Sequence, residues 1–334
     1  MANPSMAQFS STYSNGLDSL IRSVLHDDDD DISIKVKINS AKSFSNHLME
    51  VTDVDIQDKG KPDMLPGYVN DVYSHLWELE DKHLVVEDFL KDQDIRPYMR
   101  AEVIDWLIEL QEWFQLVPET LYSTVGIMDR FLQVDRDIPC NQLQLVAVTA
   151  MFIASKFEDT MAPRVTKFPE LADDLFTTTD ILAMELRILN AINYNVSFPV
   201  SLHFLRRKSK VGSVTLDTHI LARYLVELCL TEYHMSHYKP SIQAAEALCL
   251  SLKLMGGQDW TDNLVYYSRY REEDLIPVMC TMAAIVKNST NGELQAARNK
   301  FATDKFNCIS YMLYLESEFI DNLAARAIYV YAYN

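Results

Sequence analysis

Apolar residues recur along this chain at helical spacing and predict a series of helices. The first is amphipathic and covers residues 65–82, where the apolar positions fall three or four residues apart: Val69, Val72, Leu76 and Leu79. From Pro97 onward the same spacing predicts further helices over 97–115, 118–133, 140–157, 168–174 and 178–193. Prolines stand where these helices begin or end: Pro118, Pro139 and Pro163. No alternating pattern typical of strands occurs, so we expect an all-α fold.

The second half of the chain repeats part of this plan. Residues 140–157 (CNQLQLVAVTAMFIASKF) and 239–254 (KPSIQAAEALCLSLKL) both begin polar, carry alanines in the middle and end in apolar residues around a lysine. In the first segment Ala147, Ala150 and Ala154 form a stripe that lets neighbouring helices approach closely. A helix that is apolar on all sides belongs at the centre of a bundle. We therefore predict two bundles, over 96–196 and 197–305, and a tail over 306–334.

The segment before these bundles has a different composition. Residues 1–62 are rich in Ser, Asn and Asp and include the unbroken run Asp27–Asp31. Such a segment buries too little apolar surface to offset the entropy lost on ordering, so we expect a disordered acidic arm. Residues 63–95 then hold the amphipathic helix and its connection to the first bundle.

Charge and cysteine content narrow the range of functions. The 334 residues carry a formal net charge of −18, which argues against a nucleic-acid binder, because such proteins cluster Lys and Arg. The five cysteines are scattered without a CxxC pair, which is typical of reduced thiols in the cytosol or nucleus. No stretch is apolar for the roughly 18 residues that a membrane span requires. We expect a soluble protein of the cytoplasm and nucleus, bound to neither membrane nor nucleic acid.

Motifs of common enzymes are missing. The chain has no GxxxxGK[ST], GxGxxG, GxSxG or HExxH sequence. His234 and His237 form an HxxH without a third ligand nearby, so we expect no metal site and no cofactor. The run Asp27–Asp31 would suit a magnesium-dependent all-α enzyme only if a second acidic motif faced it, and none is found. We predict no catalytic residue.

Two ionic side chains interrupt apolar helix faces and indicate binding. Lys156, in the stretch MFIASKFED (151–159), shares its face with Phe152 and Ile153, and Glu185 lies in the apolar stripe of TTTDILAMELRILNAI (177–192). A buried charge without a partner costs several kcal/mol. One hypothesis pairs the two residues with each other inside the fold, or lets Lys156 cap its own helix. The other places both at the edge of an apolar patch on which another protein docks.

The helix MRAEVIDWLIELQEWF (99–114) leaves a similar choice. Arg100 opens it and Asp129 lies in the next helix, so a buried ion pair is expected to join the two helices. Met99, Val103 and Trp106 lie at successive turns, with Glu109 one turn further. These residues belong either to the core or to a shallow groove with an acidic end, suited to a basic and apolar peptide.

Four segments in this order resemble the cyclin box: MRAEVIDWL, ETLYSTVGIMDRFL, LQLVAVTAMFIASKFED and MELRILNAINYNV. The following SLHFLRRKSKVG (201–212) resembles the start of the second box in B-type mitotic cyclins. The resemblance runs from Tyr68 to Ser310 and includes five separated box positions: Arg100, Asp129, Leu145, Lys156 and Glu185. It implies two tandem five-helix cyclin boxes.

The resemblance also implies a function. The chain would be a regulatory subunit of a cyclin-dependent Ser/Thr kinase that controls mitotic (G2/M) progression and does no chemistry itself. Lys156 and Glu185 would hydrogen-bond the backbone of the kinase's mobile helix, which must move inward for the kinase to be active. Four residues would form an apolar pocket for a side chain of that helix: Ile153, Phe157, Leu189 and Val196. Glu158 would join this contact, and Tyr68 and Val72 of the leading helix would extend it.

Two further features follow from the resemblance. One group of residues matches the groove through which cyclins bind substrates or inhibitors with an Arg-x-Leu motif: Met99, Val103, Trp106, Glu109 and Gln144. Glu102 stands where the family has isoleucine, which should weaken leucine recognition in this groove. The sequence RSVL, from Arg22 to Leu25, lies where a mitotic cyclin carries its destruction signal, with Lys35, Lys37 and Lys42 accessible to the ubiquitin-ligase machinery.

Two alternatives remain at this point. A cyclin-box adaptor of the transcription-factor type would contact DNA or polymerase without activating a kinase, and would require a basic face and a zinc ribbon. An all-α magnesium-dependent enzyme would require the aspartate run for activity.

Overall fold

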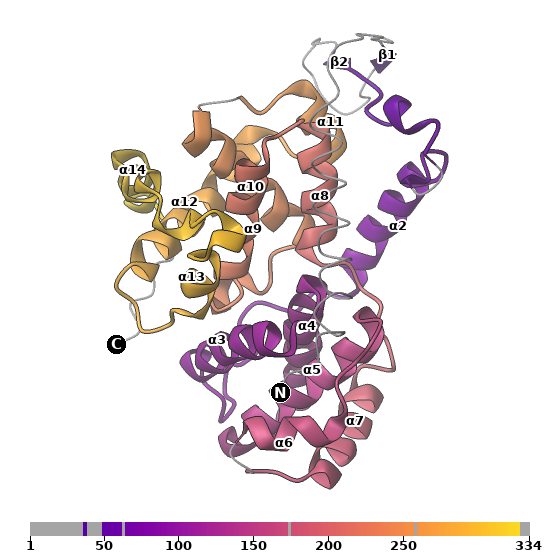
Figure 1. The fold of residues 1–334 in the computed structure, drawn as a ribbon, viewed down its shortest axis with the longest axis vertical. Coiled ribbons are helices and arrows are strands. Elements are labelled where there is room, and N and C mark those ends of the chain that lie inside the picture. The colour runs from indigo at the N-terminus through magenta and orange to yellow at the C-terminus, as the bar shows by residue number, and fades with distance from the viewer. Residues whose placement is uncertain (1–35, 39–48, 62–63, 173–174, 257–258, 328–334) are drawn as a thin grey trace.

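The computed structural model describes residues 36–38, 49–61, 64–172, 175–256 and 259–327 (Figure 1). Helices predominate in this part of the chain and form two bundles, one following the other in the sequence. A separate helix, α2 (Val69–Lys82), runs along one side of the second bundle toward the junction with the first. The expected all-α architecture of two bundles with a leading helix is confirmed.

The first bundle comprises α3 (Pro97–Phe114), α4 (Pro118–Val134), α5 (Leu143–Glu158), α6 (Phe168–Leu171) and α7 (Thr178–Ala191). Prolines at the first helical position start α3 and α4, where the missing N–H removes no hydrogen bond. α5 is the central helix and contacts α3, α4 and α7. Its small-residue stripe is fully buried, as the sequence predicts: Ala147, Ala150 and Ala154. A 3-10 turn over Cys140–Gln142 replaces the first predicted turn of α5.

The second bundle repeats this order with α8 (Ser201–Val211), α9 (Leu216–Leu228), α10 (Pro240–Gly256), α11 (Asp262–Ser268) and α12 (Glu272–Ser289). α10 takes the central place and contacts α8, α9 and α12. Its alanines are fully buried: Ala244, Ala245 and Ala247. The weak sequence repeat between the segments 140–157 and 239–254 therefore corresponds to a repeated structural role.

The chain after α12 packs onto both bundles. α13 (Ala296–Phe301) contacts α3 and α9, and the 3-10 turns η6 (Asp304–Phe306), η7 (Ile309–Tyr311) and η8 (Leu313–Glu316) lead to α14 (Glu318–Ala324) on α12. Lys300 of α13 is buried, and its ammonium donates to Gln111 Oε1 of α3 at 2.7 Å and to Glu227 of α9. α13 therefore joins the two bundles by a buried charge.

Arg100 and Asp129 form the ion pair that the sequence predicts. Arg100 Nε and Nη2 donate to the two carboxylate oxygens of Asp129 at 2.7 and 2.6 Å, and both side chains are buried. Arg100 Nη1 also donates to the backbone carbonyl of Leu230 in the second bundle at 3.0 Å. This bidentate geometry is the strong form of a charge-assisted hydrogen bond, and here it fixes α3 to α4 and to the other bundle.

The predicted disorder through residue 62 is wrong for residues 49–61. β1 (Val36–Ile38) and β2 (Met49–Val51) pair antiparallel, with Val36 opposite Val51, and the 3-10 turn η1 (Ile56–Asp58) follows. Asp55 and Asp58 are buried, because cations of α8 reach them across the fold. Composition could not reveal partners so distant in sequence. Three predicted features lie outside the described residues: the Arg22–Leu25 motif, the aspartate run, and Lys35 with Lys42.

Among the described residues, no helix combines the length and the apolar character needed to cross a bilayer. In the same part of the chain, no cluster of three or more His, Cys, Asp or Glu side chains is arranged to hold a metal ion.

Candidate protein-docking site

Lys156 and Glu185 meet at the surface of the first bundle. Lys156 occupies the last turn of α5, Glu185 lies in the middle of the adjacent α7, and the two side chains form an ion pair. The Lys156 side chain is 41% exposed and that of Glu185 15%. The Lys156 ammonium also lies 4.0 Å from the ring centroid of Phe152. The two residues therefore pair with each other, as the first hypothesis expects, but at the surface rather than inside the fold. The docking of another protein here stays a prediction.

Large apolar side chains surround this pair. Phe157 of α5 is 50% exposed, while Leu182 and Leu186 of α7 are 47% and 58% exposed. We call Lys156, Glu185 and these three residues the α5–α7 face. Sequence analysis missed Leu186, although Leu182, Glu185, Leu186 and Leu189 follow the spacing of a single helix face. An apolar surface with a charged pair at its centre is typical of a protein-interaction site.

The residues expected to form an apolar pocket differ in their accessibility. Phe157 is freely exposed, and Leu189 and Val196 are half-buried against the core. Ile153 is buried, with only 4% of its surface exposed. Phe157 is therefore the accessible member of this group, and Ile153 supports it from below.

Glu158 and Asp159 are occupied within the first bundle. Glu158 accepts a hydrogen bond from Ser123 Oγ of α4 at 2.6 Å, and Asp159 accepts from the backbone N–H of Val117 at 2.9 Å and from Thr120 Oγ1. Burial raises the pKa of both carboxyl groups, and these hydrogen bonds only partly offset the effect. In this structure, therefore, Glu158 fixes the end of α5 to α4 rather than pointing freely outward.

The leading helix α2 and its N-cap residue present two further apolar side chains. Tyr68 and Val72 are 67% and 47% exposed, whereas Tyr73 donates a hydrogen bond to the backbone carbonyl of His203 at 3.0 Å. Trp77 lies against Phe204 of α8, with ring centroids 6.0 Å apart. α2 thus binds the second bundle with one face and leaves Tyr68 and Val72 outward. Figure 1 places α2 and α7 along the same edge of the molecule.

The residues of the predicted groove lie on α3 and at the start of α5. Val103 is buried, Met99, Trp106 and Gln144 are half-buried, and Glu109 is exposed. Glu102 is exposed on the same helix. Trp113, 59% exposed and near the end of α3, was not singled out by the sequence analysis.

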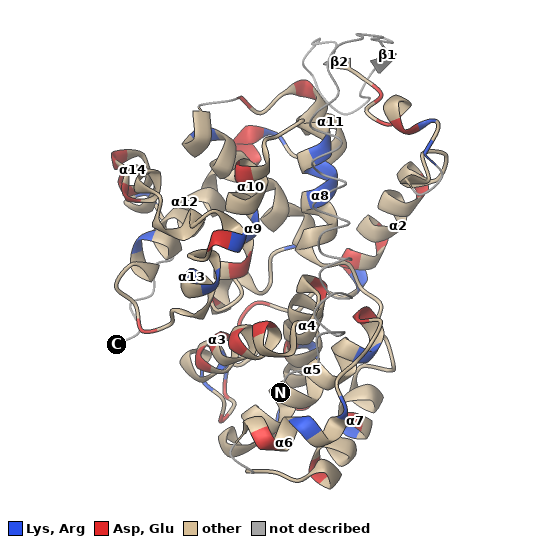
Figure 2. Ribbon diagram, in the orientation of Figure 1, with Lys and Arg blue, Asp and Glu red and all other residues tan. Residues whose placement is uncertain are grey.

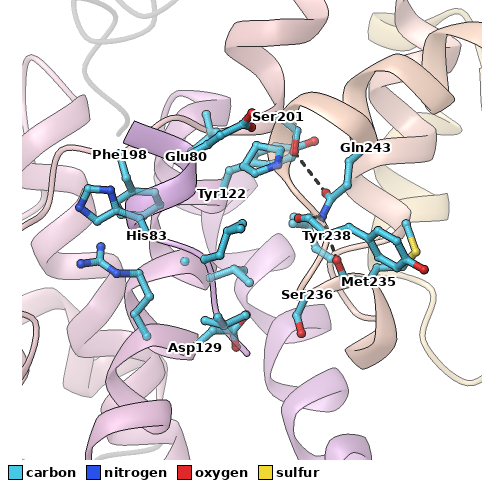
Figure 3. Close-up of a pocket in the computed structure, with 18 of the residues that line it drawn as sticks. Glu80, His83, Tyr122, Asp129, Phe198, Ser201, Met235, Ser236, Tyr238 and Gln243 are labelled. Carbon is cyan, nitrogen blue, oxygen red and sulfur yellow. Dashed lines mark hydrogen bonds between the residues drawn. The ribbon is translucent and has the colours of Figure 1, made fainter. Parts of the chain in front are cut away.

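A cavity of about 100 Å³ lies where the two bundles meet (Figure 3). Tyr122 and Asp129 line it from the first bundle, and Ser236, Tyr238 and Gln243 line it from the second. Gln243 Nε2 donates to the carbonyls of Met235 and Tyr238, at 2.8 and 3.1 Å. A water needs roughly 10–15 Å³ of such a cavity, so this volume suits several solvent molecules.

Comparison with known proteins places these features in a family. The family models "Cyclin, N-terminal domain" and "Cyclin, C-terminal domain" match residues 71–197 and 199–313. The G2/mitotic-specific cyclin-B of Spisula solidissima is 43% identical over 297 residues, which cover 89% of this chain and 69% of that protein. The G2/mitotic-specific cyclin-B1 of Xenopus laevis is 43% identical over 285 residues, covering 85% of this chain and 72% of the relative.

The same fold occurs in a more distant solved structure. The X-ray structure of a viral cyclin from herpesvirus saimiri matches with a TM-score of 0.57 at 19% identity. The match covers 66% of this chain and 96% of that one. At this identity the likeness concerns the fold alone.

Proposed function

Because this chain belongs to the cyclin family, and B-type mitotic cyclins are its relatives, we propose that the α5–α7 face binds the mobile helix of a cyclin-dependent kinase. The protein is a non-catalytic regulatory subunit that controls passage from G2 into mitosis. The observation that supports this use of the face is its composition, an accessible ion pair among exposed leucine and phenylalanine side chains.

The chemistry of the pair suits a foreign helix. The Lys156 ammonium has three donors, and its single ion-pair contact leaves capacity to bind backbone carbonyls at a helix end. The Glu185 carboxylate has a second oxygen that can accept from backbone N–H groups. Phe157, Leu182 and Leu186 supply the apolar area that such a contact buries.

Activation then follows from differential binding. A kinase of this class is active only when its mobile helix brings a glutamate to the ATP-binding lysine. A rigid surface that binds the inward position more tightly than the outward one shifts the population toward the active state. Tyr68 and Val72 of α2 extend the surface beyond the first bundle.

Further partners belong to the same proposal. The α3 groove, with Met99, Val103, Trp106, Glu109 and Gln144, would receive Arg-x-Leu segments of substrates or inhibitors. The Arg22–Leu25 motif would present the chain to ubiquitin ligases. A subunit of this kind would work in both the cytoplasm and the nucleus.

The test uses the ion pair and a matched control. We expect the double variant Lys156→Ala, Glu185→Ala to weaken kinase binding by about 100-fold or more, the scale of two interface hot-spot residues. The second bundle offers the control, since Lys253 near the end of its central helix α10 pairs with Glu272 at the start of α12 at 2.6 Å. Lys253→Ala with Glu272→Ala should leave binding unchanged. Affinity for purified cyclin-dependent kinase and histone phosphorylation are the measurements.

Full binding and activation by the Lys156 and Glu185 double variant would refute the assignment of the α5–α7 face. Equal losses in both double variants would show that general destabilisation, rather than contact, causes the effect.

A further inference from the structure

Residues 49–61, which we call the N-terminal strap, lie across α8 and α11 of the second bundle. Thr52 and Asn263 of α11 exchange two hydrogen bonds, from Thr52 N to Asn263 Oδ1 at 2.9 Å and from Asn263 Nδ2 to Thr52 Oγ1 at 2.7 Å. Tyr267 Oη donates to the Thr52 carbonyl at 3.2 Å. These contacts fix the backbone of the strap at the end of β2.

The strongest contact of the strap is a buried ion cluster. Asp55 accepts two hydrogen bonds from the guanidinium of Arg207 at 2.5 and 2.6 Å, and a third from Lys210 at 2.9 Å. Lys210 also pairs with Asp58. The side chains of Asp55 and Arg207 are 7% and 5% exposed. Figure 2 shows the corresponding basic stretch along α8. Removing Asp55 would leave the buried Arg207 guanidinium without its carboxylate partner.

Arg207 connects the strap to the leading helix. Its guanidinium carbon lies 5.4 Å from the ring centroid of Tyr73 in α2 and 4.9 Å from that of Tyr267 in α11. The phenol of Tyr73 donates to the His203 carbonyl of α8. One cation therefore contacts the strap, α2 and α11 at the same time.

α2 needs such anchors, because little of it is buried. Glu80 is its only buried residue, and isolated helices of this length are marginal in water. Glu80 fixes the C-terminal end by accepting from Ser241 N at 3.0 Å and from Ser241 Oγ at 2.7 Å. The N-terminal end, next to the exposed Tyr68 and Val72, has Tyr73 against Arg207.

We propose that the N-terminal strap is a positioning element, in which Asp55 and Arg207 hold α2 on the second bundle so that Tyr68 and Val72 are preset for kinase binding. This role rests on the proposed function. A free α2 would have to be ordered at the moment of binding. The apparent kinase affinity equals the intrinsic affinity multiplied by the fraction of molecules in which α2 is already docked.

The experiment compares three full-length chains: the wild type, Asp55→Ala and Gln57→Ala. Gln57 is exposed on the same strap and serves as the matched control. Asp55 belongs to neither bundle, so its removal deletes no side chain of either core. We expect Asp55→Ala to speed amide hydrogen exchange in α2 of the free protein at least tenfold, with α4 and α5 unchanged. If the fraction of molecules with α2 docked on the second bundle falls to about one tenth, kinase affinity should fall about tenfold.

A second pair of variants tests the partner. Arg207→Met also removes the contact with Tyr73, so it should speed α2 exchange and weaken kinase affinity at least as much as Asp55→Ala. The double variant Asp55→Ala, Arg207→Met should match Arg207→Met, because Asp55 acts on α2 through Arg207. If the effects of the two single variants on kinase affinity add in the double variant, the Asp55–Arg207 pair is not what holds α2.

The outcomes separate the two proposals. Unchanged exchange in α2 of Asp55→Ala overturns the strap as an anchor. Faster exchange with unchanged kinase affinity overturns its positioning role, while the α5–α7 face still stands on its own test. A wild-type chain that binds no cyclin-dependent kinase overturns the proposed function, and the positioning role with it.

Discussion

The fifth helices of the two bundles, α7 and α12, begin in the same way. In each, an aspartate in the first turn accepts a hydrogen bond from the backbone N–H of the N-cap residue. Asp180 accepts from Thr177 at 2.7 Å, and Asp274 accepts from Arg271 at 3.0 Å. The two helices can therefore be aligned residue by residue from these aspartates.

Beyond their first turns the two helices differ in what covers them. Leu186 of α7 is 58% exposed, whereas Cys280, at the same step of α12, is 3% exposed. α14 packs on α12, with Ile320 and Leu323 buried, and Lys287 pairs with Asp321 of α14 at 2.6 Å. The second bundle thus closes with its own chain the face that the first bundle leaves open.

The sequence shows this difference at one aligned position, which is charged in α7 and apolar in α12. Glu185 of α7 corresponds to Met279 of α12, which is buried. A carboxylate under a covering helix would lose its hydration and cost free energy unless it found a partner. Glu185 is therefore suited to a face that is solvated in the free subunit, and Met279 to one that is permanently covered.

Removing the covering contact in the second bundle should have the largest effect. Ile320 is 1% exposed, so Ile320→Ala should lower the free energy of unfolding by about 2–5 kcal/mol. Phe319, its neighbour in sequence, is 39% exposed, and Phe319→Ala serves as the control with a smaller loss. Thermal and denaturant unfolding measure both. A loss below about 0.5 kcal/mol for Ile320→Ala would contradict a closed face.

A substitution on the α5–α7 face should leave stability unchanged and weaken kinase binding instead. Leu186→Ala should change the free energy of unfolding by about 0.5 kcal/mol or less, as exposed substitutions do. It should weaken kinase binding by about 2 kcal/mol, or roughly 30-fold, if Leu186 is a hot spot of the interface. Leu313, which is 84% exposed and precedes α14, provides the control Leu313→Ala. Equal affinities of the two variants would remove Leu186 from the contact.

The smallest effect, taken per pH unit, concerns the central helices. Aligning Lys156 of α5 with Lys253 of α10 places Thr149 of α5 opposite Glu246 of α10. Both side chains are fully buried, and each is left without a side-chain hydrogen bond. Burial raises the pKa of Glu246 well above its ordinary value. The folded state therefore holds the proton more tightly than the unfolded chain.

It follows that the ionisation of Glu246 costs the fold no stability below the unfolded-state pKa, about 4.3. As the pH rises above that value toward the raised pKa, the wild type should lose about 1.4 kcal/mol of stability per pH unit relative to Glu246→Gln. Unfolding curves of both proteins at pH 5, 6 and 7 measure this difference. A difference that is constant across this range would show that Glu246 does not titrate there.

The sequence was sufficient for the helices and for the Arg100–Asp129 ion pair. Apolar spacing located α3, α4, α5 and α7 to within a few residues, and the isolated charge at Arg100 indicated a partner on a neighbouring helix. The Lys156–Glu185 pair was one of two open hypotheses. The kinase-docking role of Lys156 and Glu185, like the groove on α3, remains a prediction.

The strap could not be predicted in this way. Asp55 and Arg207 are separated by 152 positions in sequence, and the surrounding composition is that of an unstructured segment. Leu186 was missed for another reason, since an exposed leucine in a helix is ordinary until its neighbours in space are known. Both cases depend on which helices meet, which a single sequence pattern does not contain.

The buried ammonium of Lys300 determines how the chain would respond to the loss of its C-terminal part. α13 carries this group, yet its partners Gln111 and Glu227 belong to α3 and α9. Without Lys300, the buried Glu227 side chain would lose its cationic partner, and the first bundle would lose a support from far along the chain. A truncation between α12 and α13 would thus remove a buried contact that both bundles share.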